Sequence, residues 1–269
     1  MEKRISFETQ TFSKRLNSML KVDFRRMFTM PLLYIMVGVS FLIPILILVM
    51  TTSMSQTMIT DHVTGLETPM ETFTNVWQII ASTSSESAAM SMNLTGMCNI
   101  NMLYFLIAVL ICVFVSDDFR SGYAKNLFTT RSKKSDYIIS KSVIGFVGGT
   151  MMIIAFFLGA MIGGAIAKLP FDVGSAGVNG IVMCMISKIL IVLIFVSIFL
   201  TASVFAKQRL WLSILLSLGV GMLFFTMIPI MTPLDANLIN VIMCLFGSLI
   251  FSFAIGYASY YILKKTSIL

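Results

Sequence analysis

Residues 142–167 read SVIGFVGGTMMIIAFFLGAMIGGAIA, an uncharged run of 26 residues in a chain of 269. The hydrocarbon core of a bilayer is about 30 Å thick, so a helix rising 1.5 Å per residue needs about 20 apolar residues to cross it. The strands of a membrane barrel would instead alternate polar and apolar residues over about ten positions. The run therefore predicts a transmembrane α-helix.

Small residues recur every four positions within this run. Gly145 and Gly149 form one such pair, and Gly159 and Gly163 form another. This spacing places small side chains on one face of a helix, where a second helix can approach closely. We expect the face to pack against other helices of the same chain, and self-association through it is the alternative.

Five further segments meet the same length requirement. The six predicted spans lie at residues 31–50, from about 99 to 116, within 142–167, in the later part of 173–206, from 210 to about 231, and within 236–263. A mean hydropathy of +0.93 with only 12% charged residues is far from that of a soluble domain. The predicted fold class is an all-α integral membrane protein with six transmembrane helices, and residues 1–269 form a single domain.

The basic residues cluster beside the predicted spans. Seventeen of the 19 Lys and Arg residues fall in residues 1–30, 117–141, 207–209 and 264–265, which leaves net charges of +11 on one side and −4 on the other. The positive-inside rule places the +11 side in the cytoplasm, with both termini. Residues 51–98 are then external. Because the cations flank apolar spans and do not line one groove, this pattern also argues against nucleic-acid binding.

The cytoplasmic segment before the first span has the pattern of a basic amphipathic helix. Its apolar positions recur every four residues: Phe12, Leu16, Leu20, Phe24 and Phe28. Its cations, including Arg25 and Arg26, lie mostly elsewhere on the helical wheel. Such a helix lies at the membrane interface and contacts lipid headgroups. Two roles remain open, a plain anchor or an interfacial helix that also contacts a cytoplasmic partner.

The external segment carries little chemistry. Phe73, Val76, Trp77 and Ile80 have helical spacing and predict a short helix resting on the outer leaflet. His62 is the single histidine and cannot form a multi-histidine zinc site, and methionine is abundant throughout the chain. We therefore predict no metal site.

One charge interrupts a predicted span. Lys188 lies 18 residues before Ala206, which places it about 27 Å from the cytoplasmic boundary. Two interpretations remain open. The ammonium group snorkels to the external interface, or it faces a cavity and contacts an anionic or carbonyl-bearing substrate.

No motif of an enzyme is present. The chain lacks the phosphate-binding loop, the nucleophile elbow and the zinc-protease motif, and its spans hold no acidic pair for a proton relay. We predict no catalytic residue and no cofactor on this chain. Any transport through these helices is expected to draw its energy from another subunit.

Residues 116–127, SDDFRSGYAKNL, with the basic segment that follows, resemble the permeases of ABC exporters of the ABC-2 class. The large external segment is most similar to that of small bacterial permeases for bacteriocin self-immunity and peptide or drug efflux. Tyr123 departs from the family, which commonly has Thr there. The positions that match the family pattern are Asp118, Gly122, Lys125, Arg131 and Lys141.

The resemblance implies a short coupling helix within residues 117–141 that contacts cytoplasmic ATPase subunits. Asp118 would cap this helix or pair with Arg25 or Arg26, and Gly122 would permit a tight approach or a turn. Ordinary positive-inside flanking residues are the alternative reading of the same segment.

The resemblance also implies partners and an activity. The partners are ATPases that hold ATP and Mg, and a second permease subunit, identical or homologous, in the bacterial cytoplasmic membrane. The expected activity is export of an amphipathic peptide, antibiotic or lipid-like molecule by alternating access. The alternatives are export of a polysaccharide or an ion, and a non-transporting sensor or immunity protein that binds its ligand through residues 51–98.

Overall fold

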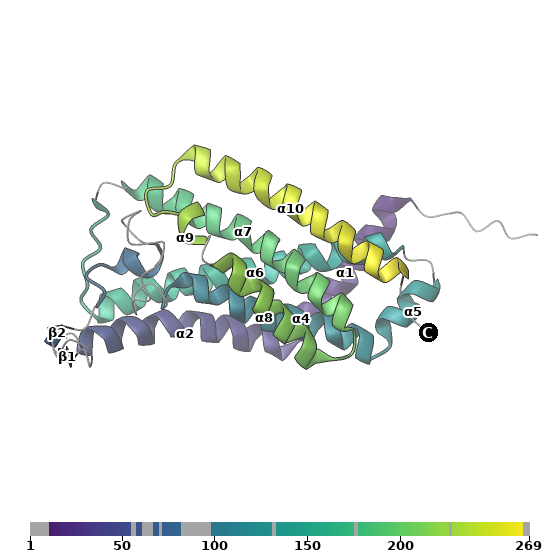
Figure 1. The fold of residues 1–269 in the computed structure, drawn as a ribbon, viewed down its shortest axis with the longest axis horizontal. Coiled ribbons are helices and arrows are strands. Elements are labelled where there is room, and N and C mark those ends of the chain that lie inside the picture. Colours follow the sequence, from purple (N-terminus) through teal and green to yellow (C-terminus); the bar gives the residue numbers. More distant parts are fainter. Residues whose placement is uncertain are drawn as a thin grey trace, which may run out of the picture.

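The structure is a computed structural model, and it describes residues 11–54, 58–60, 67–69, 72–81, 98–130, 133–174, 177–225 and 228–265. The helices form one elongated bundle whose long members run roughly along its long axis (Figure 1). We call the end formed by α1, α5 and the last turn of α10 the basic end, and the end where α7 and α10 begin the opposite end.

The α-helices are α1 (Phe12–Thr29), α2 (Pro31–Ser53), α4 (Leu103–Arg120), α5 (Tyr123–Thr130), α6 (Lys134–Ile166), α7 (Gly177–Ala206), α8 (Leu210–Phe225), α9 (Ile228–Met231) and α10 (Leu238–Lys265). Two 3₁₀ turns are η1 (Val76–Ile79) and η2 (Ile100–Met102). Two three-residue strands, β1 (Met58–Thr60) and β2 (Glu67–Pro69), pair antiparallel. The described part of the chain is thus almost entirely helical, as predicted.

Five of these helices are long and apolar enough to cross a membrane: α2, α4 with the preceding turn η2, α6, α7 and α10. The prediction of six spans is therefore met only in part. In the predicted fifth span the structure describes α8, with 16 residues, and α9, with four, while residues 226–227 lie outside the described residues. Pro229 is the second residue of α9, and the first turn of a helix is where a residue without a backbone N–H is tolerated.

α6 lies at the centre of the bundle and contacts α2, α7, α1, α4 and α10. A Cβ atom at Gly159 or Gly163 would strike the backbone of α2, at Phe41 and Ile45 respectively. A Cβ atom at Gly149 would strike Val192 of α7. The small-residue face is thus used for packing within the chain, because only glycine allows these helices to approach so closely.

The helices near the basic end extend further than predicted. α4 continues to Arg120 and α6 begins at Lys134, so most of the segment at residues 117–141 that links the predicted second and third spans is helical. In the described part of that stretch, only residues 121–122 and 133 lie outside helices. Polar residues at the end of a span do not end a helix when their side chains have partners, as those described below do.

The external helix predicted around Trp77 has a different form. It is the single 3₁₀ turn η1, and Phe73, Val76, Trp77 and Ile80 are all buried. The turn packs against α6, and the Trp77 indole donates a hydrogen bond to the Phe171 carbonyl at 3.2 Å. These apolar residues therefore cover the end of the bundle and do not rest on a lipid leaflet.

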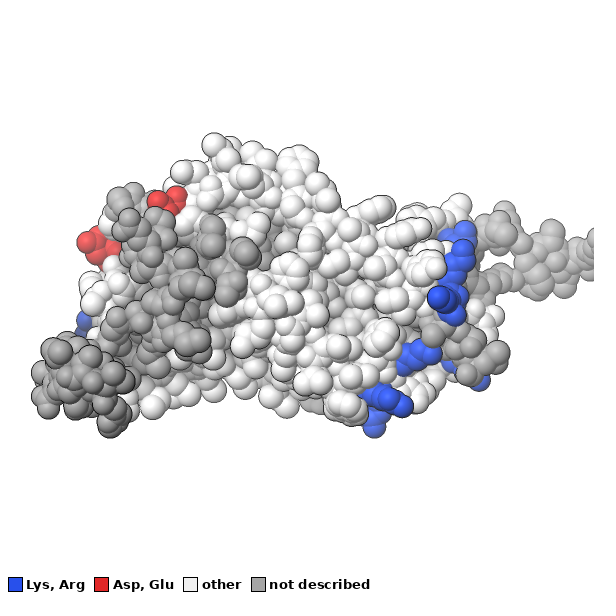
Figure 2. Space-filling model, in the orientation of Figure 1, with Lys and Arg blue, Asp and Glu red and all other residues white. Residues whose placement is uncertain are grey.

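Charge is distributed unequally between the two ends. Lys and Arg side chains gather at the basic end, whereas the acidic residues visible in the same view lie at the opposite end (Figure 2). The start of α1 and the end of α10 lie together at the basic end (Figure 1). The clusters that were separated along the sequence are thus brought to one end of the bundle.

Candidate functional site

Four charged side chains from three helices meet inside the basic end of the bundle. Asp23 and Arg26 come from α1, Asp118 from the last turn of α4, and Lys141 from the third turn of α6. We call these four residues the charge network. The side chains of Asp23, Asp118 and Lys141 have no solvent exposure, and that of Arg26 is 27% exposed.

Lys141 is the centre of the charge network. Its Nζ atom lies 2.6 Å from Asp118 Oδ2 and 3.0 Å from Asp23 Oδ1. The same ammonium lies 4.0 Å from the centre of the Phe114 ring, in the geometry of a cation–π contact. One lysine therefore joins α6 to both α1 and α4.

Arg26 joins α1 to α4 and to α5. Its guanidinium donates to Asp118 Oδ1 at 2.6 Å and lies over the Tyr123 ring, 4.2 Å from the ring centre. Burial acts to lower the pKa of Arg26, but the charge and hydrogen bond of Asp118, together with Tyr123 and Asp23, outweigh it and raise that pKa above its ordinary value. Arg26 therefore stays charged.

Neutral groups complete the hydrogen bonds of the two buried carboxylates. The Tyr137 hydroxyl donates to Asp118 Oδ2 at 3.0 Å, and the Ser140 hydroxyl donates to Asp23 Oδ2 at 2.7 Å. Two cations thus balance two anions, each with hydrogen bonds. The attraction and hydrogen bonds between these charges offset the cost of removing them from water. Removal of one member leaves an uncompensated buried charge, which lowers the free energy of unfolding by about 3–5 kcal/mol.

A second ion pair extends the contact between α1 and α6. Arg15 Nε donates to Asp136 Oδ2 at 3.0 Å, near the first turn of α6. Asp136 is buried, whereas Arg15 is partly exposed. α1 is therefore fixed to α6 at two points about two turns apart along its own axis, and it is held as part of the bundle.

Gly122 forms the joint between the charge network and α5. Its φ angle is +75°, a conformation that L side chains rarely adopt, and a Cβ atom there would meet nothing within 4 Å. Of the two predicted roles for Gly122, the structure has the turn and not the tight approach. The turn redirects the chain from α4 into α5 two residues after α4 ends.

α5 is a short amphipathic helix. Ala124 is buried, and Leu127 and Phe128 are partly buried against the core, whereas Lys125 is exposed. The helix contacts α4, and Phe128 meets the Tyr137 ring edge-on. One face of α5 is thus held by the bundle while Lys125 projects from the other face.

The sequence-predicted residues fall into three groups. Asp118 and Lys141 converge in the charge network, together with Arg26, whose predicted pairing with Asp118 is present. Gly122 and Lys125 lie beside it, as described. Arg131 lies outside the described residues.

The predicted apolar face of α1 is only partly covered. Phe12 and Phe28 are exposed, and Leu20 and Phe24 are partly buried against the core. Leu16, the remaining member of that face, is partly buried, and the predicted interfacial cation Arg25 is exposed. The face that packs on α6 is a different one, formed by Met19, Asp23 and Met27.

Sequence reasoning missed Asp23, Tyr137 and Ser140. One signal could have identified Asp23: it is the only acidic residue within α1 and stands four residues from both Met19 and Met27. An acid between two apolar residues on one helical face indicates a partner cation inside the protein. Tyr137 and Ser140 carry no comparable local signal.

Lys188 is remote from the charge network. It lies on α7 towards the opposite end, with no exposed surface, and its Nζ donates to Asn101 Oδ1 at 3.0 Å and to Thr232 Oγ1 at 2.9 Å. In this structure the ammonium therefore does not snorkel to an interface.

Within the described residues, no group of three or more His, Cys, Asp or Glu side chains is arranged to hold a metal ion. His62 lies outside those residues. Comparisons with protein-family models, with curated proteins and with solved structures found no match to this chain. The case for its function therefore rests on the residues and their geometry.

Proposed function

We propose that this chain is the membrane permease subunit of an ATP-driven exporter of the ABC-2 type. In this proposal the basic end faces the cytoplasm, and α5 is the coupling helix that contacts the ATPase. The observation that carries the proposal is the charge network, which ties the α4–α5 joint to α1 and α6 through buried ion pairs of 2.6 and 3.0 Å.

A force applied to α5 would need a stiff connection to the spans in order to move them. α5 itself is short and partly exposed, so it transmits little through its own apolar contacts. The charge network supplies the stiffness, because separating any of its helices would leave a buried charge unpaired. Coupling between distant sites is carried by such packed and ion-paired elements. α1, α4 and α6 would then move together when α5 is displaced.

We further propose that α8 and α9 together form a sixth crossing. α7 ends and α8 begins at the basic end, while α10 begins at the opposite end (Figure 1). A 16-residue helix covers about 24 Å, and α9 continues the path towards the start of α10. Six crossings are consistent with the positions of α1 and the end of α10 at one end.

The proposed assembly contains two such membrane subunits, identical or homologous, and two ATPases that hold ATP and Mg. The proposed substrate is an amphipathic peptide, antibiotic or lipid-like molecule. The positive-inside distribution supports the orientation, since most Lys and Arg residues lie at the end that carries α5. The proposed location is the bacterial cytoplasmic membrane.

Affinity purification of the full chain from its native membranes tests this function. We expect an ABC ATPase to copurify and to hydrolyse ATP, while the chain alone hydrolyses none. Lys125→Glu reverses an exposed charge on α5 and should reduce copurification without affecting folding. Lys168→Glu makes the same change at an exposed residue of the opposite end and should leave it unchanged. A preparation without any ATPase, or ATP hydrolysis by the isolated chain, would contradict the proposal.

A further inference from the structure

Lys188 differs in its partners from Lys141, the other fully buried lysine among the described residues. Lys141 has two carboxylates, whereas the Lys188 ammonium donates only to the neutral oxygens of Asn101 and Thr232. Among the described residues, no carboxylate forms an ion pair with Lys188. A lysine inside a membrane bundle is costly unless its charge is compensated, and such a residue indicates a functional site.

The hydrogen-bonding capacity around Lys188 is also incompletely used. An ammonium group has three N–H donors, and two of them have acceptors within the described part of the chain. The adjacent Ser187 hydroxyl is buried, and its contact with the Cys244 thiol is weak, since sulfur is a poor hydrogen-bonding group. Buried polar groups are normally paired, so an unused ammonium donor beside a weakly paired hydroxyl indicates a missing acceptor.

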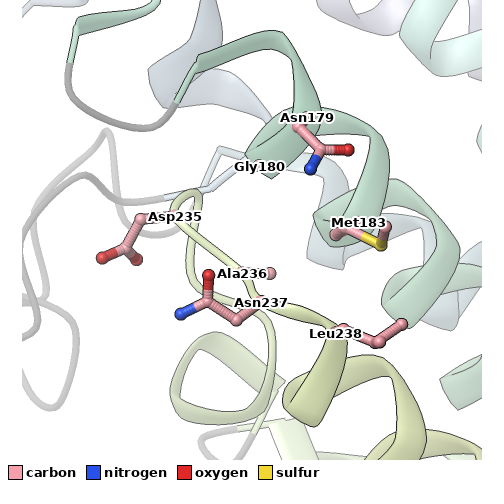
Figure 3. A pocket seen from close by; sticks show the side chains of 7 residues that line it. All are labelled: Asn179, Gly180, Met183, Asp235, Ala236, Asn237 and Leu238. Atoms are coloured by element: carbon pink, nitrogen blue, oxygen red, sulfur yellow. The ribbon is translucent and has the colours of Figure 1, made fainter.

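A pocket of about 370 Å³ lies at the opposite end, between the start of α7 and the segment leading into α10. Figure 3 shows Asn179 and Met183 on α7, with Asn237 and Leu238 on the segment that leads into α10; the Asp235 carboxylate and the Asn237 amide both point away from Met183. The lining therefore holds two amide groups, on Asn179 and Asn237, and one carboxylate, on Asp235.

The pocket and Lys188 share one face of α7. Gly180 lines the pocket, and Cys184 and Lys188 follow it at intervals of four residues, all of them buried. The Cα atom of Lys188 therefore lies about 12 Å further along α7 than the Cα atom of Gly180. Thr232, which accepts from Lys188, stands three residues before Asp235 at the pocket rim.

We propose that Lys188 and Ser187 form an anion-binding site reached through this pocket. The ligand is a small molecule with a single carboxylate or similar monoanionic group, which would accept from the Lys188 ammonium and the Ser187 hydroxyl. Asn179 and Asn237 would contact the polar part of the ligand near the pocket mouth. The site goes beyond the export proposal, because an anion can bind here whether or not the chain couples to an ATPase.

Native Cys184, one turn from Lys188, provides a reporter. The purified full-length chain is treated with two thiol reagents of similar size, anionic 2-sulfonatoethyl and cationic 2-(trimethylammonio)ethyl methanethiosulfonate. The modification rate of Cys184 is followed by peptide mass spectrometry and divided by the rate with free mercaptoethanol. The ratio of the two normalised rates reports attraction of an anion and cancels any change in thiol ionisation.

We expect the wild-type ratio to favour the anionic reagent by about tenfold, as a nearby uncompensated cation predicts. Lys188→Met should bring the ratio close to one, and Lys188→Arg should keep the preference. Lys168→Met, at an exposed lysine of the same end, should leave the wild-type ratio unchanged. In the wild-type chain, millimolar hexanoate should slow labelling of Cys184, whereas hexylamine should not.

Several results would overturn the anion site. They are a wild-type ratio near one, a preference that survives Lys188→Met, failure of hexanoate to protect, and a Cys184 that reacts with neither reagent. The hexanoate measurement needs no variant, so it decides the question even if Lys188→Met fails to insert. None of these measurements involves an ATPase, so failure here leaves the export proposal standing.

Discussion

Lys141 is the residue on which the stability of the basic end depends most. Its ammonium contacts both buried carboxylates of the charge network, and the remaining cation, Arg26, makes a short contact only with Asp118. Lys141→Met keeps an apolar stem of similar length but leaves Asp23 without a close cation. We expect a loss of about 3–5 kcal/mol in unfolding free energy. The measurement is the thermal unfolding midpoint of the purified chain in detergent.

Two further variants make this prediction specific. Lys125→Met removes an exposed lysine from α5 and should change stability by no more than about 0.5 kcal/mol. Adding Asp23→Asn to Lys141→Met removes the stranded anion, so the double variant should lose less than the sum of the two single variants. Equal midpoints for Lys141→Met and Lys125→Met would show that the charge network contributes nothing to stability.

Only part of the charge network could be predicted from the sequence. Asp118 and Lys141 are singled out by their match to the pattern of ABC-2 permeases, which is read along the chain. The contact between Asp23 and Lys141 joins residues 118 positions apart and depends on which face of α1 meets α6. Face selection is decided by tertiary packing, which the amphipathic pattern of Phe12 to Phe28 alone does not determine.

At the scale of elements, the packing of α6 on α2 is the contact most sensitive to a single methyl group. Gly159→Leu would drive a side chain into the carbonyl group of Phe41, and a helix backbone cannot move aside as a flexible side chain can. We expect the two helices to separate and the protein to lose thermal stability, or to be degraded before purification. Expression level and unfolding midpoint in detergent measure the effect.

Gly247→Leu is the matched control on α10. A Cβ atom at Gly247 meets nothing within 4 Å, and leucine has the higher helix propensity. This variant should be as stable as the wild type or slightly more so. If Gly159→Leu were equally stable, close packing of α2 on α6 would be excluded.

The sequence predicted the existence of the long helices well and their ends poorly. A run of 20 apolar residues is a local property, and it determines a spanning helix almost regardless of context. The extension of α6 back to Lys134 depends on partners supplied by α1, which no local pattern shows. η1 was mistaken for a surface helix because an amphipathic turn has the same pattern whether it covers lipid or protein.

At the scale of the whole molecule, the unequal charge distribution predicts a single orientation in the membrane. In a background with Cys98→Ser and Cys184→Ser, a cysteine at Asp172 should react with an impermeant maleimide in intact cells. A cysteine at Lys125 should react only after lysis. Both positions are exposed in the structure, so differences in burial do not explain a difference in labelling. Reaction at Lys125→Cys in intact cells would reverse the assigned orientation.

The central claim is that α5, fixed by the charge network, transmits force between an ATPase and the spans. The most direct measurement is the rate of ATP hydrolysis by the copurified ATPase, assembled in nanodiscs with wild-type chain or with Gly122→Val. A β-branched residue at φ +75° is strained by about 1–2 kcal/mol, so the α4–α5 joint should deform while the spans remain folded. We predict that the wild-type chain and Lys168→Gln alter the hydrolysis rate of the ATPase equally, and that Gly122→Val returns it to the rate of the ATPase alone. Full wild-type stimulation by Gly122→Val would contradict the claim.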